Sequence, residues 1–111
     1  VHAHAEQDRR SHVEAARRGA WVEFDGVAPD TVEQHVALVA AMREAGHLDR
    51  VLVSHDAGWY HVGEPQGGAY RGYETLFTQL IPALERAGFR HEEIALITVT
   101  NPAKALALDA V

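Results

Sequence analysis

The segment Val51-Leu-Val-Ser-His-Asp56 constrains the fold of this chain more than any other stretch. It opens with an apolar run that lacks polar alternation, which is typical of a parallel strand buried on both faces. The run ends in His55 and Asp56, so the strand carries polar groups to its carboxyl end. In folds built on parallel sheets, binding and catalytic residues gather at these ends. The segment therefore predicts a buried parallel strand that delivers site residues.

Strand and helix signals alternate along the rest of the chain. The patterns predict strands at 1–5, 21–25 and 51–54. They predict helices at 9–18, 74–87 and 92–97, and another that begins at an Asp30 or Thr31 cap and ends at Gly46. A last helix is predicted to begin at an Asn101 cap, with Pro102 at its first position. Pro82 lies inside the helix 74–87 and predicts a kink or a break there. This β-α alternation predicts an α/β fold with a parallel sheet and right-handed crossovers.

Composition excludes several classes of function. The net charge of −6, with no basic patch, argues against a nucleic-acid partner. No apolar run approaches the roughly 20 residues of a membrane span, so we expect no membrane partner and a cytoplasmic protein. The chain has no cysteine, and any metal site must therefore use its 8 histidines and 16 carboxylates. Four histidines on predicted helices or their flanking turns are expected at the surface: His12, His35, His47 and His91.

His2 and His4 open the chain on one side of a strand, because strand side chains alternate. Together they suit one metal ion or a pair of ions. Only one complete strand, 21–25, separates them from Asp56, which rules out the first and last strands of a barrel of about 250 residues. The two histidines fit the sixth strand of such a barrel, with residues 21–25 as the seventh strand and 51–56 as the eighth. In this arrangement we expect only one of the two histidines to be a metal ligand. We therefore expect a piece of a longer protein.

Asp56 is either a metal ligand that accepts a proton from water or the cap of the next turn.

An irregular stretch from Gly58 to Gly72 follows this strand. It holds Pro65, five glycines and several aromatic residues. Loops of this length are usually functional or disordered.

Four segments of the chain resemble the phosphotriesterase family of the amidohydrolase superfamily, which includes aryldialkylphosphatases and lactonases. They are residues 1–8, 18–26, 51–56 and 97–103, and the last, Ile-Thr-Val-Thr-Asn-Pro-Ala, is the most specific. The resemblance spans essentially the whole chain but only about the last third of the family's length. It implies that residues 1–111 are one partial domain, the C-terminal βα segment of a TIM (β/α)8 barrel with strands 6–8 and the terminal helices, and that the N-terminal part is absent.

The resemblance also implies a binuclear metal-dependent hydrolase, with zinc as the expected divalent metal. His2 matches the sixth-strand ligand, and the spacing to Arg18 and Gly19 fits without gaps only for this histidine. Asp56 matches the eighth-strand aspartate, both a metal ligand and the catalytic proton acceptor. The other four protein ligands lie before Val1 in the family pattern. The expected substrate-facing residues are Asp25, Trp59, Tyr60 and His61.

The substrate implied by the resemblance is a small ester, which is a phosphotriester, a lactone or a related carboxylic ester. Ala5 and Gly26 replace a carboxylate and a His or Arg that family phosphotriesterases often carry, so a lactone or another ester suits the chain at least as well. We expect a homo-oligomer. One alternative is an inactive fragment that folds only by pairing its open strand edges with another chain or copy. A flavodoxin-like binding module is a weaker alternative, because no glycine-rich phosphate loop follows the first strand.

Overall fold

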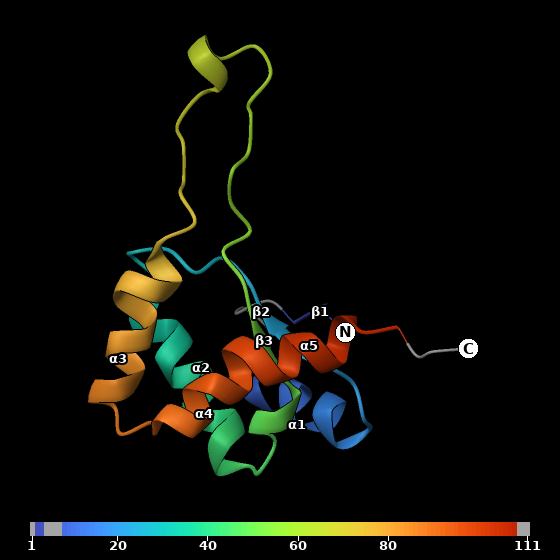
Figure 1. The fold of residues 1–111 in the computed structure, drawn as a ribbon. Helices are drawn as coiled ribbons and strands as arrows, with labels where there is room; N and C mark the ends of the chain where they lie inside the picture. The colour runs from blue at the N-terminus through green and yellow to red at the C-terminus, as the bar shows by residue number, and fades with distance from the viewer. Residues whose placement is uncertain (1, 4–7, 109–111) are drawn as a thin grey trace.

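Three short parallel strands form one sheet in the computed structural model, which describes residues 2–3 and 8–108 (Figure 1). The strands are β1 (His2–Ala3), β2 (Val22–Phe24) and β3 (Val51–Val53), in the spatial order β1-β2-β3. The register pairs His2 with Glu23 and Glu23 with Leu52. The predicted parallel sheet and its three strand positions are confirmed.

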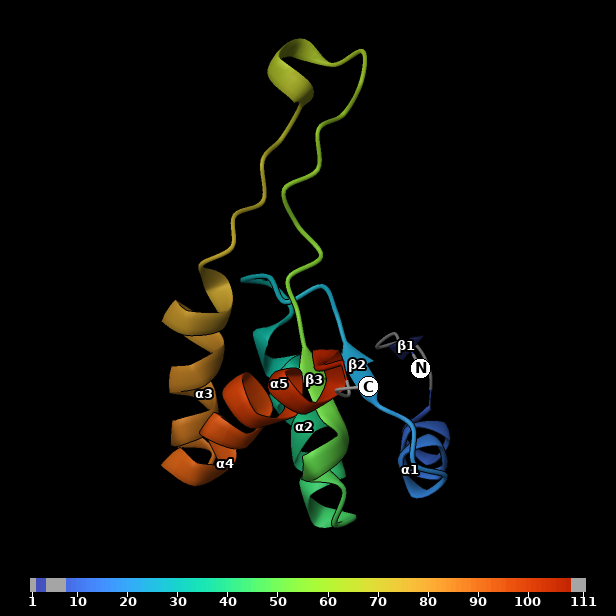
Figure 2. The ribbon, with the colours of Figure 1, turned by 45° about the vertical axis from the view of Figure 1, so that its right-hand side comes forward.

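Helices connect the strands and follow the last one. The helical elements are α1 (Arg9–Arg17), α2 (Val32–Glu44), η1 (Leu48–Arg50), η2 (Pro65–Gly67), η3 (Leu76–Leu80), α3 (Ile81–Arg86), α4 (His91–Ala95), η4 (Leu96–Thr100) and α5 (Asn101–Leu106). Helix α2 contacts α1 on one side and η3 with α3 on the other, while η4 and α5 lie against β3 (Figures 1 and 2). In the described part of the chain, no helix combines the length and apolar character that crossing a bilayer requires.

The hydrophobic core lies between the helices and one face of the sheet. Val22, Phe24 and Val51 have no exposed surface, whereas Glu23, between the first two, is only half-buried. This alternation follows from the period of a strand. Each large apolar side chain buried in this way contributes about 1.5 to 3 kcal/mol. The other face of the sheet thus carries the polar groups.

The two long helical runs after β3, residues 76–86 and 91–106, each contain a π-helical segment just before a proline. Segment η3 precedes Pro82, and η4 precedes Pro102. A proline has no N–H to donate, and its ring collides with the carbonyl four residues earlier. A wider π turn accommodates both effects. The kink predicted at Pro82 is therefore a local widening, and the helix continues to Arg86.

Asn101 does not cap a separate helix, and that prediction is wrong. Helical residues run without a break from His91 to Leu106, and Asn101 lies within this run. Its side chain is fully buried, and its Nδ2 donates to the carbonyl oxygens of Leu48 at 2.9 Å and Val51 at 2.8 Å. The amide therefore fastens the C-terminal helix to the start of β3.

The segment from Gly58 to Gly72, here called the arm, rises away from the carboxyl edge of the sheet (Figures 1 and 2). It accounts for a radius of gyration of 15.0 Å, against about 13 Å for a compact chain of this length. The two legs of the arm are joined by hydrogen bonds from Gly58 N to Arg71 O, at 3.1 Å, and from His61 N to Gly67 O, at 2.8 Å.

Candidate functional site at the carboxyl ends of the strands

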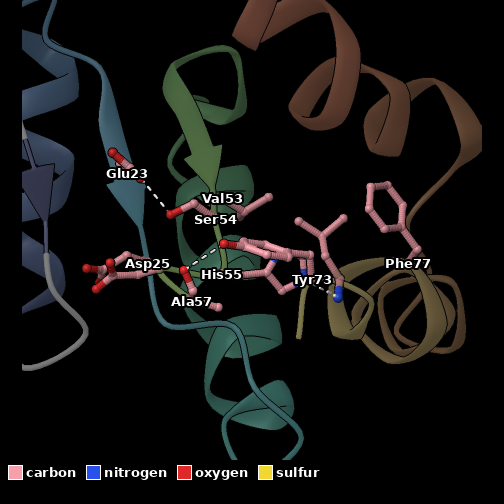
Figure 3. A pocket seen from close by; sticks show the side chains of 10 residues that line it. Glu23, Asp25, Val53, Ser54, His55, Ala57, Tyr73 and Phe77 are labelled. Carbon is pink, nitrogen blue, oxygen red and sulfur yellow. Dashed lines mark hydrogen bonds between the residues drawn. The ribbon is translucent and has the colours of Figure 1, made fainter. Parts of the chain in front are cut away.

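A pocket of about 520 Å³ lies where β2 and β3 end and η3 begins (Figure 3). It is lined by Glu23, Asp25, Val53, Ser54, His55, Asp56, Ala57, Tyr73, Leu76 and Phe77. The structure therefore brings together Asp25 and Asp56, two of the residues that the sequence nominates for the site. Three of the lining residues, Glu23, Asp25 and Asp56, carry carboxylate side chains.

Asp56 adopts a backbone conformation that few non-glycine residues take. Its φ angle is +48°, in the left-handed region, which aspartate tolerates better than most residues. Its carbonyl oxygen accepts hydrogen bonds from Trp59 Nε1, at 3.0 Å, and from Arg71 Nη2. Such conformations persist where the surroundings fix them, and they cluster at functional sites. The base of the arm thus fixes the backbone from which the Asp56 carboxylate projects.

Glu23 and Ser54 form a link that the sequence patterns did not reveal. The Ser54 hydroxyl donates to Glu23 Oε1 at 2.6 Å, a short bond of the kind that a charged acceptor makes (Figure 3). Leu52 is the register partner of Glu23, and Ser54 lies two residues beyond it. The link joins β2 to β3 within the pocket.

Tyr73 is a second pocket residue that the sequence patterns missed. Its hydroxyl donates to the Ala57 carbonyl oxygen at 3.0 Å. Gly58, with φ of +80°, lies so close that a Cβ there would meet this hydroxyl. The only sequence signal was the glycine that begins the arm.

His55 is buried and anchors the helix that follows the arm. Its Nε2 accepts the backbone N–H of Leu76 at 3.0 Å, so Nδ1 carries the ring proton. This bond satisfies one of the N–H groups that a helix start leaves without an internal partner. Burial lowers the pKa of His55 below its ordinary value; the Arg71 charge acts in the same direction, and the Glu74 charge opposes it.

We expect the His55 interaction to make stability depend on pH. Because the folded-state pKa is lowered, the contribution is complete above the ordinary value of 6.5 and is lost as pH falls through the lowered one. The free energy of unfolding, from chemical denaturation at pH values of 6.5 and below, should fall more steeply with decreasing pH for the parent than for His55→Gln. The glutamine amide oxygen still accepts the N–H of Leu76 but does not titrate in this range. Equal pH dependence in the two proteins would contradict this role.

The three aromatic and histidine residues nominated on the arm do not line this pocket. Trp59 and His61 border a separate hollow of about 270 Å³ with Ala69 and Arg71. Tyr60 is 72% exposed, and its ring lies beside Gly67. Their contact with substrate stays a prediction.

His2 belongs to β1, the strand next to Glu23 in the sheet, and its side chain lies outside what the structure describes. His4 lies outside the described residues altogether. Within residues 2–3 and 8–108, no three His, Asp or Glu side chains gather closely enough to hold a metal ion. The carboxylate oxygens in the pocket are nonetheless donors of the kind that divalent cations accept. The chemical type of these donor atoms therefore suits a divalent cation, and a complete metal site would need further ligands from outside the described residues.

Two of the histidines expected at the surface are buried instead. His12 is 2% exposed, and its ring meets Phe24 edge-on with 5.0 Å between centroids. His35 is 1% exposed and is hydrogen-bonded through both ring nitrogens. His47 is partly exposed and His91 is exposed.

Relatives of known sequence share this chain's pattern over most of its length. The phosphotriesterase homology protein of Escherichia coli K12 is 32% identical over 89 residues, which cover 78% of this chain and 30% of that protein. A phosphotriesterase-related protein of Drosophila persimilis is 36% identical over 76 residues, which cover 68% of this chain and 21% of that protein. The chain therefore spans less than a third of these relatives.

Several solved structures also have a fold similar to that of this chain. The Escherichia coli homology protein, with phosphate in its active site, matches with a TM-score of 0.75 and 27% identity, covering 94% of this chain and 37% of that one. The phosphotriesterase from Mycobacterium tuberculosis matches with a TM-score of 0.75 and 26% identity, covering 90% and 33%. These neighbours are TIM-barrel proteins of the phosphotriesterase type. The model of the phosphotriesterase family matches residues 1–106, and the chain belongs to this family.

Proposed function

We propose that this chain is the C-terminal βα segment, strands six to eight and the terminal helices, of a TIM-barrel hydrolase that cleaves a small ester with an activated water. The observation that carries the proposal is the meeting of Asp25 and Asp56 in one pocket at the carboxyl ends of β2 and β3. This is the edge at which TIM-barrel enzymes hold their catalytic residues. The family membership of residues 1–106 supports the same conclusion.

His2 and Asp56 are the residues of this chain that would hold a divalent metal, zinc in the first instance. Structural and catalytic zinc sites use at least three protein ligands, so the full-length protein must supply the others. A bound divalent cation makes water nucleophilic near neutral pH and polarises the bond to be broken. In the full-length protein we expect two such ions.

The residues of the chain divide the remaining tasks. The Asp56 carboxylate, on a backbone fixed by Trp59 and Arg71, accepts the proton that the attacking water loses. Asp25 lines the same pocket and orients the ester. The arm residues Trp59, Tyr60 and His61 close over the leaving group.

A second candidate is that the isolated 111-residue chain is inactive and needs a partner for its sheet. In the described sheet, β1 and β3 each have a neighbouring strand on one side only. Exposed edges of this kind bind further strands. We propose that the edges pair with the remainder of the barrel, and that the complete protein forms a homo-oligomer in the cytoplasm.

A substrate panel tests the proposed function. Full-length protein with added zinc is offered aliphatic lactones, aryl carboxylic esters and a dialkyl aryl phosphotriester, and product formation is followed for each. We expect hydrolysis of at least one class, with a lactone at least as good as the phosphotriester because Ala5 and Gly26 replace the usual polar residues. Hydrolysis of none of the three classes would contradict the proposal.

A further inference from the structure

His35 occupies a position in which both of its ring nitrogens face carbonyl oxygens. Nδ1 lies 2.8 Å from the carbonyl oxygen of Thr31, one turn earlier in the chain. Nε2 lies 2.6 Å from the carbonyl oxygen of Asp25, at the end of β2. The side chain is 1% exposed, so water does not compete for either nitrogen.

A carbonyl oxygen can only accept a hydrogen bond. A neutral imidazole has one N–H and one lone pair, so it satisfies one of the two oxygens and turns its lone pair on the other. At 2.6 or 2.8 Å, two facing lone pairs repel each other. Only a ring protonated at both nitrogens donates to both oxygens, and such charge-assisted bonds are short and strong.

The surroundings of His35 set the cost of this charge. Asp25 follows β2, and Asp30 and Glu33 flank the start of α2, so three carboxylates lie within the ten residues that precede His35 in the sequence. The segment η3, which packs against α2, has no titratable side chain. The opposing influences are the positive end of the α2 dipole and the desolvation of the ring.

The elements on the remaining sides of α2 carry other titratable groups. Helix α1 contributes the buried His12, whose Nε2 has no hydrogen-bond partner among the described residues. Helix α3 contributes Glu85 and Arg86, which are exposed. The segment η1 contributes Asp49, exposed, and Arg50, half-buried against the Trp21 ring.

The Thr31 side chain also holds the loop between β2 and α2 in place. The Thr31 hydroxyl accepts the N–H of Ala28 at 3.0 Å and donates to the carbonyl oxygen of Gly26 at 2.8 Å. The loop between β2 and α2 is therefore held at Asp25 by the His35 ring and at the next residue by Thr31. Residues that lock a neighbour's backbone in this way position the side chain it carries.

We propose that His35 is a doubly protonated positioning residue that clamps the carboxyl end of β2 and so fixes where Asp25 enters the pocket. The charge and the clamp follow from contacts within the chain. The consequence for an ester substrate rests on the proposed function. His35 does not line the pocket; it contacts the backbone of Asp25, and Asp25 lines the pocket.

Nitrogen-15 NMR of full-length protein with labelled histidine tests the charge directly, at a pH about one unit above the ordinary histidine pKa of about 6.5. Both ring nitrogens of His35 should carry protons. His55 should carry one, at Nδ1, because its Nε2 accepts the N–H of Leu76. A ring nitrogen of His35 without a proton would overturn the proposal whether or not the protein hydrolyses esters.

Two substitutions test the clamp. His35→Arg keeps a charge and several donors, whereas His35→Gln is neutral and its amide donates through one nitrogen. We expect Gln to shift the amide signals of Asp25 and Gly26 and to lower ester hydrolysis by about tenfold or more, as misplaced site residues do, with Arg closer to the parent in both readouts. Unchanged amide signals in a folded His35→Gln protein would overturn the clamp. Hydrolysis absent from the parent, with His35 doubly protonated, would reject the proposed function alone.

Discussion

Asp56→Asn should lower ester hydrolysis by the full-length protein by a factor of about 10² to 10⁴, the usual contribution of a positioned proton acceptor. The asparagine amide has nearly the same shape but does not accept a proton at neutral pH. The backbone should keep its geometry, because asparagine also tolerates the left-handed region. The Trp59 and Arg71 bonds end on the carbonyl oxygen of residue 56, which the substitution leaves in place. The loss of proton acceptance is therefore measured as kcat at saturating substrate and saturating zinc, so that a weaker affinity for the metal does not contribute to it.

Asp49→Asn is the matched control for this substitution. Asp49 is an exposed aspartate in η1, at the opposite end of β3 from the pocket. It makes the same change of charge and size, and we expect activity within about twofold of the parent, as for surface substitutions of small effect. Full activity in Asp56→Asn would contradict the role of Asp56, and an equal loss in both variants would show an effect of net charge instead.

Asn101→Asp should destabilise the protein by about 3 to 5 kcal/mol, the cost of leaving a charge buried without a partner. The Nδ2 group donates to the carbonyl oxygens of Leu48 and Val51, and the side chain is fully buried. A carboxylate in its place loses both donors and turns negative oxygens on two carbonyl oxygens. The free energy of unfolding from urea denaturation at neutral pH measures the effect.

Gln79→Glu provides the control for Asn101→Asp, because it also converts an amide to a carboxylate. Gln79 is exposed on η3. Surface changes of this kind usually stay within about 0.5 kcal/mol. A loss below about 1 kcal/mol in Asn101→Asp would mean that the two amide bonds do little to hold the C-terminal helix on β3.

The strands and most helix ends were predictable from local sequence. An apolar run located β3, an alternation of apolar and polar residues located β2, and glycines after α1, α2 and α3 marked the ends of these helices. The start of α5 was not predictable, because Asn-Pro has the same local pattern as a capped helix start. The partners of Asn101 lie 53 and 50 residues earlier in the chain, where no local pattern reports them.

The candidate site was predictable only in part, for a similar reason. Asp25 and Asp56 each end a strand, and the carboxyl ends of parallel strands meet at one edge. The Glu23–Ser54 link depends on the register of β2 and β3, which the sequence does not specify. The burial of His35 depends on carbonyl acceptors at the end of β2, so its place on a helix indicated surface exposure wrongly.

Metal dependence is the most direct test of the central claim that this pocket activates water for ester cleavage. Full-length protein is stripped with a chelator, zinc is titrated back, and both bound zinc and hydrolysis of the best substrate are followed. We predict that hydrolysis disappears on stripping and returns with zinc, and that His2→Ala and Asp56→Asn weaken zinc binding. Undiminished hydrolysis by the stripped protein would contradict it.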